Sequence, residues 1–377
     1  MEQRTAIVIG AGIVGLATAR ALSNKGFKVK VFERSHKAVG ASIRNFGMIW
    51  PIGQPSGKLY ERALQSRSIW KQICTEANIW HSEAGSIHVA HHPDEMQVLH
   101  ELYDCYNKER SIALFNKDQV TDFSQAVEPN NLLGGLYSKD ELLVDARHAI
   151  ELLPAYLNEK YGVEFYWGKC ITYIADNTVY IGNDEEHEAD VIFVCSGADF
   201  ETLYPEIYLK LPITKCKLQM MRLQSQPDEW RIGPALCGGL SLIHYKSFAA
   251  APSLKKLKDR YNEEMSEYIN WGIHVMVAQN EAGELTIGDS HEYGLTHDPF
   301  DKAEINDLVL SYLKKIARFK NWTIKESWNG IYPKLTNGDT ELFISPEPGV
   351  YIINGLGGAG MTLSFGFAEE CVEQVKI

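Results

Sequence analysis

The strongest constraint on the fold is a spaced set of glycines between an apolar strand and a helix near the N-terminus. The β-branched run Thr5–Ile9 leads into Gly10, Gly12 and Gly15, and apolar residues then recur at helical spacing over Ile13–Lys25. Gly10 permits a tight turn, Gly12 lets the backbone approach a pyrophosphate, and Gly15 lets the helix pack on the strand. This arrangement predicts the first turn of a dinucleotide-binding βαβ unit.

A second strand supports that interpretation. Gly26 ends the helix, and Lys28–Glu33 follows as an apolar strand that closes on an acidic residue. Glu33 is placed to accept a hydrogen bond from a ribose 2′-hydroxyl, and its charge disfavours a 2′-phosphate. The sequence therefore favours FAD or NAD over NADP. The alternative is a glycine turn with a purely structural role.

A second glycine cluster lies near the other end of the chain. Gly355–Thr362 separates a predicted strand, Val350–Asn354, from a predicted helix over about Thr362–Val375. A helix N-terminus here can direct amide donors at the N1/C2=O edge of a flavin, where negative charge accumulates on reduction. NAD has no use for such a turn, so the cluster favours FAD. A close-packed turn with no ligand is the alternative.

Together with Gly40–Gly47 (GASIRNFG) and Ala189–Ala198 (ADVIFVCSGA), these motifs resemble the superfamily of D-amino-acid oxidase, glycine oxidase and sarcosine oxidase. The resemblance covers essentially the whole chain. It implies an α/β fold with a discontinuous Rossmann-like FAD-binding domain and an α+β substrate domain built on an antiparallel sheet. The expected boundaries are 1–80, 140–205 and 325–377 for the FAD-binding domain, and 81–139 and 206–324 for the substrate-binding domain.

The resemblance also implies which residues meet the cofactor. Family members that tether flavin covalently do so through a cysteine or a histidine. The corresponding segments of this chain contain neither residue, so we expect non-covalent FAD. The expected FAD contacts are Gly10, Gly12, Ile13, Val14, Gly15, Glu33, Arg34, Ser42, Arg44, Asn45, Gly47, Ile171, Gly197, Gly330, Gly357, Gly358, Gly360, Met361 and Thr362.

The sequence departs from the sarcosine oxidase pattern at two positions. Thr286 stands at the position where sarcosine oxidases have a lysine that activates oxygen. Thr362 stands at the position where they have a lysine that anchors the substrate carboxylate. The segment Gly40–Gln54 is similar to a subgroup associated with aminophosphonate breakdown. We therefore expect a small anionic amine as substrate, either an amino acid, an N-methyl amino acid or an aminophosphonate. The expected substrate pocket comprises Arg44, Trp50, His244, Tyr245 and Tyr332.

The resemblance implies oxidation of a C–N bond by hydride transfer to flavin N5, giving an imine that hydrolyses to a carbonyl compound. Oxygen or another acceptor then takes the electrons. A dehydrogenase of the same fold, using a quinone or a carrier protein, is one alternative. A non-catalytic dinucleotide-binding sensor is another.

Composition excludes several other classes. With 37 basic and 49 acidic residues the net charge is −12, which repels a phosphate backbone, so no nucleic-acid partner is expected. No apolar run is long enough to span a membrane. The seven cysteines are odd in number and form no Cys-x-x-Cys pair, which favours a cytoplasmic location without disulfides.

Some polar clusters have ordinary explanations. His88, His91 and His92 are more typical of a polar strand end than of a metal site, and we expect no metal. Lys215, Lys217 and Arg222 fit either an anion site or a solvated strand edge. The predicted elements of the second domain are strands at Leu218–Leu223, Ser241–Tyr245, Ile273–Ala278 and Leu285–Gly288 and a helix at Ala303–Arg318.

Overall fold

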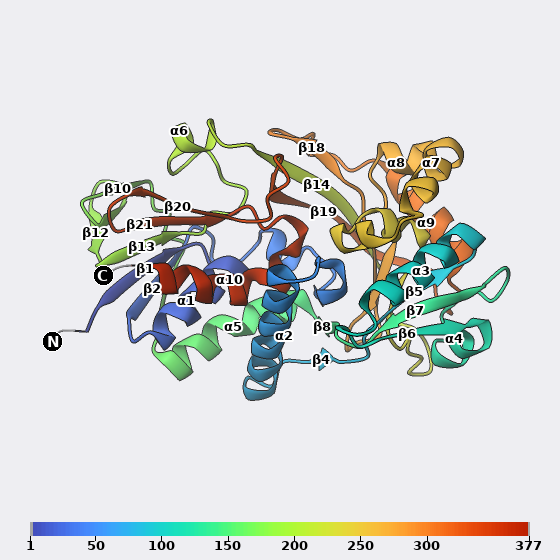
Figure 1. The fold of residues 1–377 in the computed structure, drawn as a ribbon. Coiled ribbons are helices and arrows are strands. Elements are labelled where there is room, and N and C mark those ends of the chain that lie inside the picture. The colour runs from blue at the N-terminus through green and yellow to red at the C-terminus, as the bar shows by residue number, and fades with distance from the viewer. Residues whose placement is uncertain (1–2, 376–377) are drawn as a thin grey trace.

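A six-stranded sheet forms one end of the molecule in the computed structural model, which describes residues 3–375 (Figure 1). Its neighbours pair in parallel except at one edge, where β20 runs antiparallel to β21. In spatial order the strands are β20 (Leu342–Glu347), β21 (Val350–Asn354), β13 (Val191–Val194), β1 (Thr5–Ile9), β2 (Lys28–Glu33) and β9 (Glu164–Trp167).

Both faces of this sheet are covered, which explains the continuous apolar character of β1. Ala6 and Val8 pack among the helices, whereas Ile7 and Ile9 pack on the opposite side. Residues of the small antiparallel sheet β10 (Tyr173–Ala175), β11 (Thr178–Ile181) and β12 (Glu185–Glu188) contribute to that second cluster. The helices on the first face are α1 (Ile13–Asn24), α2 (Lys58–Glu76), α5 (Ala146–Tyr161) and α10 (Gly360–Gln374).

Local sequence signals set the ends of α5. The Asp145 carboxylate accepts hydrogen bonds from the amides of Arg147 and His148 at 3.1 and 3.4 Å, which caps the first turn. At the other end Gly162 adopts a left-handed conformation with φ of +71°. The helix therefore begins and ends where polar and glycine residues supply those conformations.

A nine-stranded sheet forms the other end of the molecule. The longest strands, β14 (Ile213–Leu223) and β19 (Ile324–Leu335), pair antiparallel along their whole length and lie over the gap between the two sheets in Figure 1. The other strands are β5 (Ser86–Ala90), β6 (Ile112–Asn116), β7 (Gly134–Ser138), β15 (Ala235–Cys237), β16 (Met276–Gln279), β17 (Leu285–Gly288) and β18 (Glu292–Gly294).

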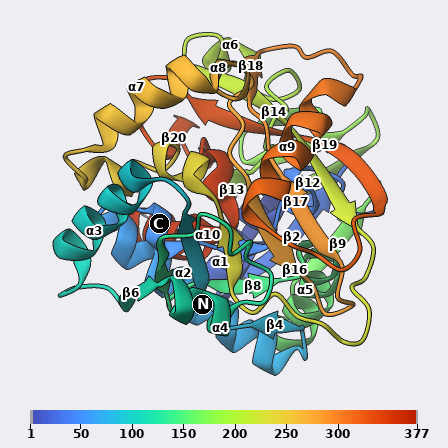
Figure 2. The same ribbon diagram turned by 90° about the vertical axis from the view of Figure 1, so that its right-hand side faces the viewer.

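Helices cover this second sheet, as Figure 2 shows from the side. They are α3 (Pro93–Tyr106), α4 (Lys117–Phe123), α7 (Leu254–Glu264), α8 (Ser266–Asn270) and α9 (Ala303–Ile316), with the 3₁₀ helices η3 (Gly239–Ile243) and η4 (Lys246–Ala250). The smaller elements are η1 (Ala41–Ile43), η2 (Pro51–Gly53), α6 (Pro205–Tyr208), η5 (Gly357–Ala359) and the short sheet β3 (Met48–Ile49), β8 (Leu142–Val144) and β4 (His81–Ser82).

The predicted α/β fold class is confirmed. The predicted strand Ser241–Tyr245 is wrong, because Gly239–Ile243 forms a 3₁₀ helix instead. The amides of Ser241 and His244 bond to carbonyls three residues earlier, and a short apolar run does not distinguish a strand from a buried helical turn. The domain boundaries stay a prediction; the one at 324/325 falls at the start of β19.

Of the two alternatives for the basic residues of β14, the solvated strand edge is wrong for Lys217 and Arg222. Lys217 is 1% exposed and Arg222 is 7% exposed. The Lys217 ammonium donates hydrogen bonds to the carbonyls of Asp298 and Phe300, at 2.8 and 2.5 Å, and so ties β14 to the loop that precedes α9. Its buried charge is compensated by these acceptors, rather than by solvent.

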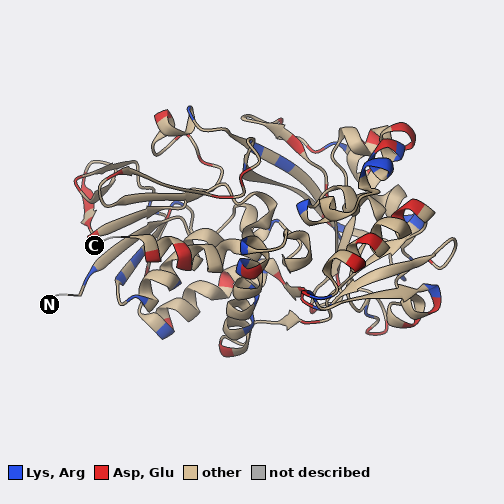
Figure 3. Cartoon of the chain, in the orientation of Figure 1, with Lys and Arg blue, Asp and Glu red and all other residues tan. Residues whose placement is uncertain are grey.

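Charged residues are spread over both ends of the molecule, and Figure 3 shows acidic and basic positions interspersed on the helices and loops. Within residues 3–375, none of the helices combines the length and the apolar character needed to cross a bilayer.

Candidate functional site

The first glycine turn connects β1 to α1 by a very close backbone approach. Gly10 has φ of +105°, and a Cβ there would lie 2.4 Å from the Cys195 carbonyl oxygen. A Cβ on Gly15 would lie 1.8 Å from the Gly10 carbonyl oxygen. Both distances are far below van der Waals contact, so the turn needs glycine at these two positions.

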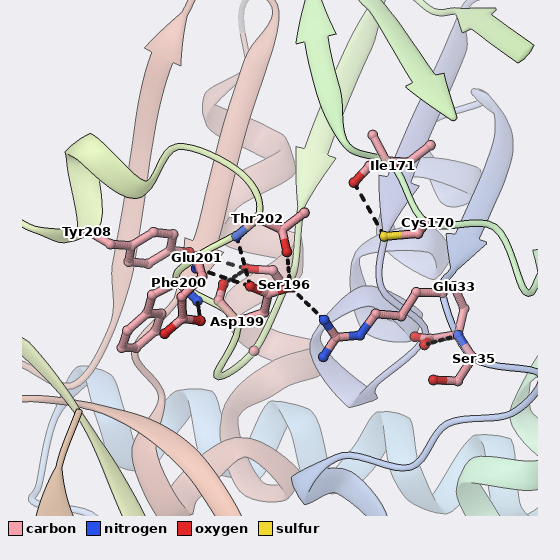
Figure 4. Close-up of polar contacts among 12 residues, drawn as sticks. Glu33, Ser35, Cys170, Ile171, Ser196, Asp199, Phe200, Glu201, Thr202 and Tyr208 are labelled. Atoms are coloured by element: carbon pink, nitrogen blue, oxygen red, sulfur yellow. Dashed lines mark hydrogen bonds and ion pairs between the residues drawn. The ribbon is translucent and has the colours of Figure 1, made fainter. Parts of the chain in front are cut away.

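Glu33 at the end of β2 is bound to the same turn. One of its carboxylate oxygens accepts a hydrogen bond from the Ala11 amide at 3.0 Å, and the other accepts from the Ser35 amide at 2.9 Å. Figure 4 shows the Glu33 carboxylate beside Ser35. Since each carboxylate oxygen offers a second lone pair, Glu33 can still accept a hydrogen bond from a ligand.

The segment Gly40–Gly47 folds against the start of α1. The Ser42 hydroxyl accepts a hydrogen bond from the Ile13 amide at 2.9 Å. The Asn45 amide group donates to the carbonyls of Ala41 and Ser42, at 3.0 and 2.9 Å, while its oxygen accepts from the Gly47 amide at 2.7 Å. These bonds hold Ser42 at the N-terminus of α1.

Asp199 is a residue of this region that sequence reasoning missed. Its carboxylate accepts hydrogen bonds from the hydroxyl and amide of Thr202, at 2.7 and 3.0 Å (Figure 4). It also accepts a hydrogen bond from the Arg34 guanidinium at 2.7 Å. Burial alone would raise the pKa of the Asp199 carboxyl. These hydrogen bonds lower it by a larger amount, so the pKa lies below its ordinary value. The carboxylate therefore fixes the loop after β13 and orients Arg34.

The second glycine turn lies between β21 and α10 and contacts the β3–η2 segment. The Thr362 hydroxyl accepts a hydrogen bond from the Trp50 amide at 2.9 Å, and the Trp70 indole donates to the Met361 carbonyl at 2.8 Å. A Cβ on Gly358 would lie 3.6 Å from the Tyr332 hydroxyl. The turn is thus connected to aromatic residues of the central cavity.

One cavity of about 1630 Å³ runs from the first glycine turn to the second sheet. Gly15 and Gly47 do not line it; Gly15 packs on Gly10, and Gly47 packs on the Val144 carbonyl. All the other residues predicted from the sequence line this cavity: Gly10, Gly12, Ile13, Val14, Glu33, Arg34, Ser42, Arg44, Asn45, Trp50, Ile171, Gly197, His244, Tyr245, Gly330, Tyr332, Gly357, Gly358, Gly360, Met361 and Thr362.

Aromatic side chains enclose the end of the cavity near the second sheet. The rings of Trp50 and Tyr245 lie 6.2 Å apart, and burial raises the pKa of Tyr245 and of Tyr332 far above its usual range. Both phenols are therefore neutral at neutral pH. Arg44 borders the same region, where its guanidinium donates to the Asn329 carbonyl at 3.0 Å.

Three further polar residues of this wall were missed by sequence reasoning. His274, Asp289 and His291 join His244 around one side of the cavity. Burial alone would raise the pKa of the Asp289 carboxyl. The neighbouring His274 and His291 lower it by a larger amount, so the pKa lies below its ordinary value. Burial lowers the pKa of His291 to about 4. At neutral pH Asp289 is a carboxylate and His291 is neutral.

The histidines that the sequence places in one short motif do not converge on a common centre. His91 bonds to the Glu128 carbonyl at 2.9 Å, and His92 contacts the Asp94 carboxylate at 2.6 Å. His88 is buried beside Trp50 and Phe248. In the described part of the chain each therefore has a separate environment.

The cavity fits an extended dinucleotide. A Cβ on Gly12 would lie 3.1 Å from the Ser42 hydroxyl, whereas Gly197 faces open space in a left-handed conformation with φ of +58°. The cavity thus has two glycine turns with exposed backbone, an acidic residue at the ribose end and an aromatic chamber at the other end. NAD would leave the second turn without a ligand, whereas FAD would use both.

Comparison with known proteins agrees with this geometry. The profile of the family described as "FAD dependent oxidoreductase" matches residues 5–374. A tRNA 5-methylaminomethyl-2-thiouridine biosynthesis bifunctional protein from Marinomonas sp. is 23% identical over 389 residues, covering 93% of this chain and 56% of that protein. The chain thus spans less than two thirds of the length of the curated relatives it matches.

Two solved structures are similar over nearly the whole chain. Glycine oxidase from Geobacillus kaustophilus superposes with a TM-score of 0.78 at 19% identity, covering 99% of this chain and 96% of that one. L-proline dehydrogenase from P. horikoshii superposes with a TM-score of 0.77 at 19% identity, and the match covers 99% of this chain and 93% of that one. At this level of identity the likeness establishes the fold.

Proposed function

Because the chain belongs to the FAD dependent oxidoreductase family, and is therefore an FAD-dependent oxidoreductase, we propose that it oxidises the C–N bond of a small anionic amine. The observation that carries this proposal is the single cavity that joins both glycine turns to an enclosed aromatic chamber. Such a chamber is the right size and character for a small organic substrate beside a redox cofactor. Known relatives with this fold include glycine oxidase and L-proline dehydrogenase, which supports an amine as substrate.

We assign the adenosine diphosphate half of FAD to the first glycine turn. Glu33 would accept hydrogen bonds from the ribose, and Gly10, Gly12 and the start of α1 would face the pyrophosphate. Ser42 and Asn45 would lie along the diphosphate, with Ile171 near the adenine. The hydrogen bond from Ile13 to Ser42 supports this arrangement, because it places a hydroxyl beside the α1 N-terminus.

The isoalloxazine would lie against the second glycine turn. Gly357, Gly358 and Gly360 line the cavity at the start of α10, whose N-terminal amides and dipole stabilise negative charge. Bound FAD supplies the redox chemistry by accepting a hydride from the carbon next to the substrate nitrogen. The resulting imine takes up water and gives a carbonyl compound and ammonia or a smaller amine.

The protein's own residues would orient the substrate and exclude water. Trp50 and Tyr245 enclose one side, and Tyr332 lies beside the second glycine turn. Desolvation by the aromatic side of this chamber favours the neutral amine, which is the form that can lose a hydride. Arg44 would bind the anionic group of the substrate, since a guanidinium forms charge-assisted hydrogen bonds with a carboxylate or phosphonate.

The electron acceptor is a separate question. Thr286, at the position where sarcosine oxidases have a lysine, accepts hydrogen bonds from Arg222 at 3.3 and 3.1 Å and is 3% exposed. Thr286 is not among the residues that line the cavity, so this position presents no ammonium to it. This observation favours the second candidate, an amine dehydrogenase of the same fold that passes electrons to a quinone or a carrier protein.

An anaerobic screen of the FAD-loaded protein tests the proposal. Small amino acids, N-methyl amino acids and aminophosphonates are added in turn, and the visible absorbance of the flavin is followed. We expect bleaching by at least one anionic amine. Bound flavin that no amine bleaches would favour a non-catalytic dinucleotide sensor. Reoxidation by air or by an artificial quinone then separates oxidase from dehydrogenase.

A further inference from the structure

Three histidines and one aspartate meet in the cavity wall from distant parts of the chain. His244 follows η3, His274 precedes β16, Asp289 follows β17, and His291 precedes β18. One nitrogen of each histidine lies within 4.8 Å of one nitrogen of each of the others. His274, Asp289 and His291 are 3%, 6% and 6% exposed, whereas His244 is exposed where it lines the cavity.

Polar contacts define how two of these rings are oriented. The His291 Nδ1 lies 2.8 Å from the Gly272 carbonyl oxygen, so Nδ1 carries the proton and Nε2 has a free lone pair. The His274 Nε2 lies 2.9 Å from an Asp289 carboxylate oxygen, within ion-pair distance, although that oxygen has no hydrogen-bond partner of good geometry.

Within residues 3–375, two buried polar atoms of this cluster lack a hydrogen-bond partner: the His274 Nδ1 and one carboxylate oxygen of Asp289. The His291 Nε2 lies 4.0 Å from the second oxygen of Asp289, so that a lone pair faces a carboxylate. A buried acceptor without a donor is costly, and the cluster would be stabilised by a cation placed among its nitrogens.

We propose that His244, His274 and His291 bind one divalent transition-metal ion of the Zn²⁺ type. Imidazole nitrogens are preferred ligands of such ions, and three protein ligands leave a position open for water or a ligand oxygen. Asp289 and the Gly272 carbonyl hold the second nitrogens of two rings, which is the usual outer-shell support of metal-binding histidines. In this structure the His274 ring stacks on His244 with centroids 3.8 Å apart and on His291 with centroids 5.2 Å apart. Coordination therefore requires the rings to turn until their nitrogens point at one ion and lie roughly 3.4 Å apart, as tetrahedral geometry demands.

A metal ion fits this cluster better than a substrate ammonium group does. An ammonium group would take its ionic partner from Asp289, which is the one carboxylate among these four residues and already contacts His274 through one of its oxygens. Three imidazole nitrogens instead match a borderline-soft metal ion. The open position would face the same chamber as Tyr245 and could hold an anionic substrate oxygen.

Metal binding to the FAD-loaded protein tests the inference without any measurement of turnover. The protein is treated with a chelator, dialysed, and titrated with Zn²⁺ in competition with a chromophoric chelator. We expect one Zn²⁺ per chain. His244→Ala should weaken binding by at least 100-fold, and Asp289→Asn by 10- to 100-fold, because Asp289 supports His274 from outside the coordination shell.

His148→Ala is the matched control, because His148 is exposed on α5 and does not line the cavity. Flavin content and circular dichroism show whether each variant is folded; His244 lines the cavity, so its truncation leaves the core intact. Equal Zn²⁺ affinity in the wild-type protein and His244→Ala would overturn the inference. Absence of Zn²⁺ binding to the wild-type protein would overturn it as well.

Discussion

The Glu33 carboxylate accepts a hydrogen bond from the Ala11 amide at 3.0 Å, and this bond joins the end of β2 to the interior of the first glycine turn. The turn and the acidic residue are therefore one structural unit. A second hydrogen bond, from the Ser35 amide at 2.9 Å, fixes the other carboxylate oxygen. Glu33 thus shapes the turn before any ligand is bound.

Glu33→Gln should weaken FAD binding about tenfold, since the amide nitrogen of glutamine cannot accept one of these two backbone hydrogen bonds. The dissociation constant is measured by the fluorescence of released flavin. Glu186→Gln, on an exposed position of β12, is the control and should bind FAD normally. Unchanged affinity in Glu33→Gln would show that the carboxylate does not contribute to the cofactor site.

Gly15→Ala should prevent stable FAD loading. Its Cβ would lie 1.8 Å from the Gly10 carbonyl oxygen, which forces the turn and α1 apart, and the cost should exceed about 3 kcal/mol. Gly40→Ala is the matched control, because that Cβ meets open space at a residue that lines the same cavity. Thermal unfolding and flavin content are measured for both variants. Equal melting temperatures would contradict the close approach.

Thr362→Val should lower the free energy of unfolding by about 1–3 kcal/mol. It removes the acceptor of the buried Trp50 amide while keeping the shape of the side chain. Thr362→Ser retains the hydroxyl and should lose much less. Urea unfolding of the FAD-loaded protein measures the difference, and a serine variant as unstable as the valine variant would assign the effect to packing.

Arg44→Met should raise KM for the amine much more than it lowers FAD affinity, because the guanidinium is proposed to bind the substrate anion. Arg67→Met, on α2 and outside the cavity, should change neither quantity. Steady-state kinetics and flavin titration are compared. Loss of FAD with unchanged KM after reconstitution would instead assign Arg44 to the cofactor.

The sequence predicted those parts of the fold and site that depend on local patterns. Gly10, Glu33 and Gly358 lie in contiguous motifs whose spacing follows from a strand, a turn and a helix. These residues line the cavity, and their contacts with FAD stay a prediction. The same reasoning did not find His274 or Asp289. They reach the wall only through strand pairing in the nine-stranded sheet, and no sequence period connects them to His244.

Asp199 was missed for a related reason. Its role depends on the loop after β13 turning back on itself to meet Thr202 and Arg34, and the sequence there has no fixed motif for that turn. The segment at Ser241 was assigned to the wrong element because its apolar residues are buried in either conformation. Sequence patterns thus predicted local turns better than contacts between distant segments.

Glu141 should make the free energy of unfolding depend on pH between its ordinary pKa of 4.5 and its folded-state pKa of about 7. Burial raises its pKa from 4.5 to about 7, although its carboxylate accepts hydrogen bonds from the Ile52 amide at 3.0 Å and the Ser86 hydroxyl at 3.1 Å. Between these two pH values the folded protein binds more protons than the unfolded chain, so the free energy of unfolding falls as pH rises. The loss due to Glu141 amounts to about 3 kcal/mol and is complete above pH 7.

Glu141→Gln removes this titration and should flatten the profile of unfolding free energy between pH 5 and pH 8. The difference between the variant and the wild-type protein isolates Glu141 from other titrating groups. Glu159→Gln, exposed on α5, is the control and should follow the wild-type profile. Urea unfolding of the FAD-loaded protein measures these curves. A Glu141→Gln profile parallel to that of the wild type would mean that Glu141 is already ionised in the folded state at pH 5, with its two hydrogen bonds compensating for burial.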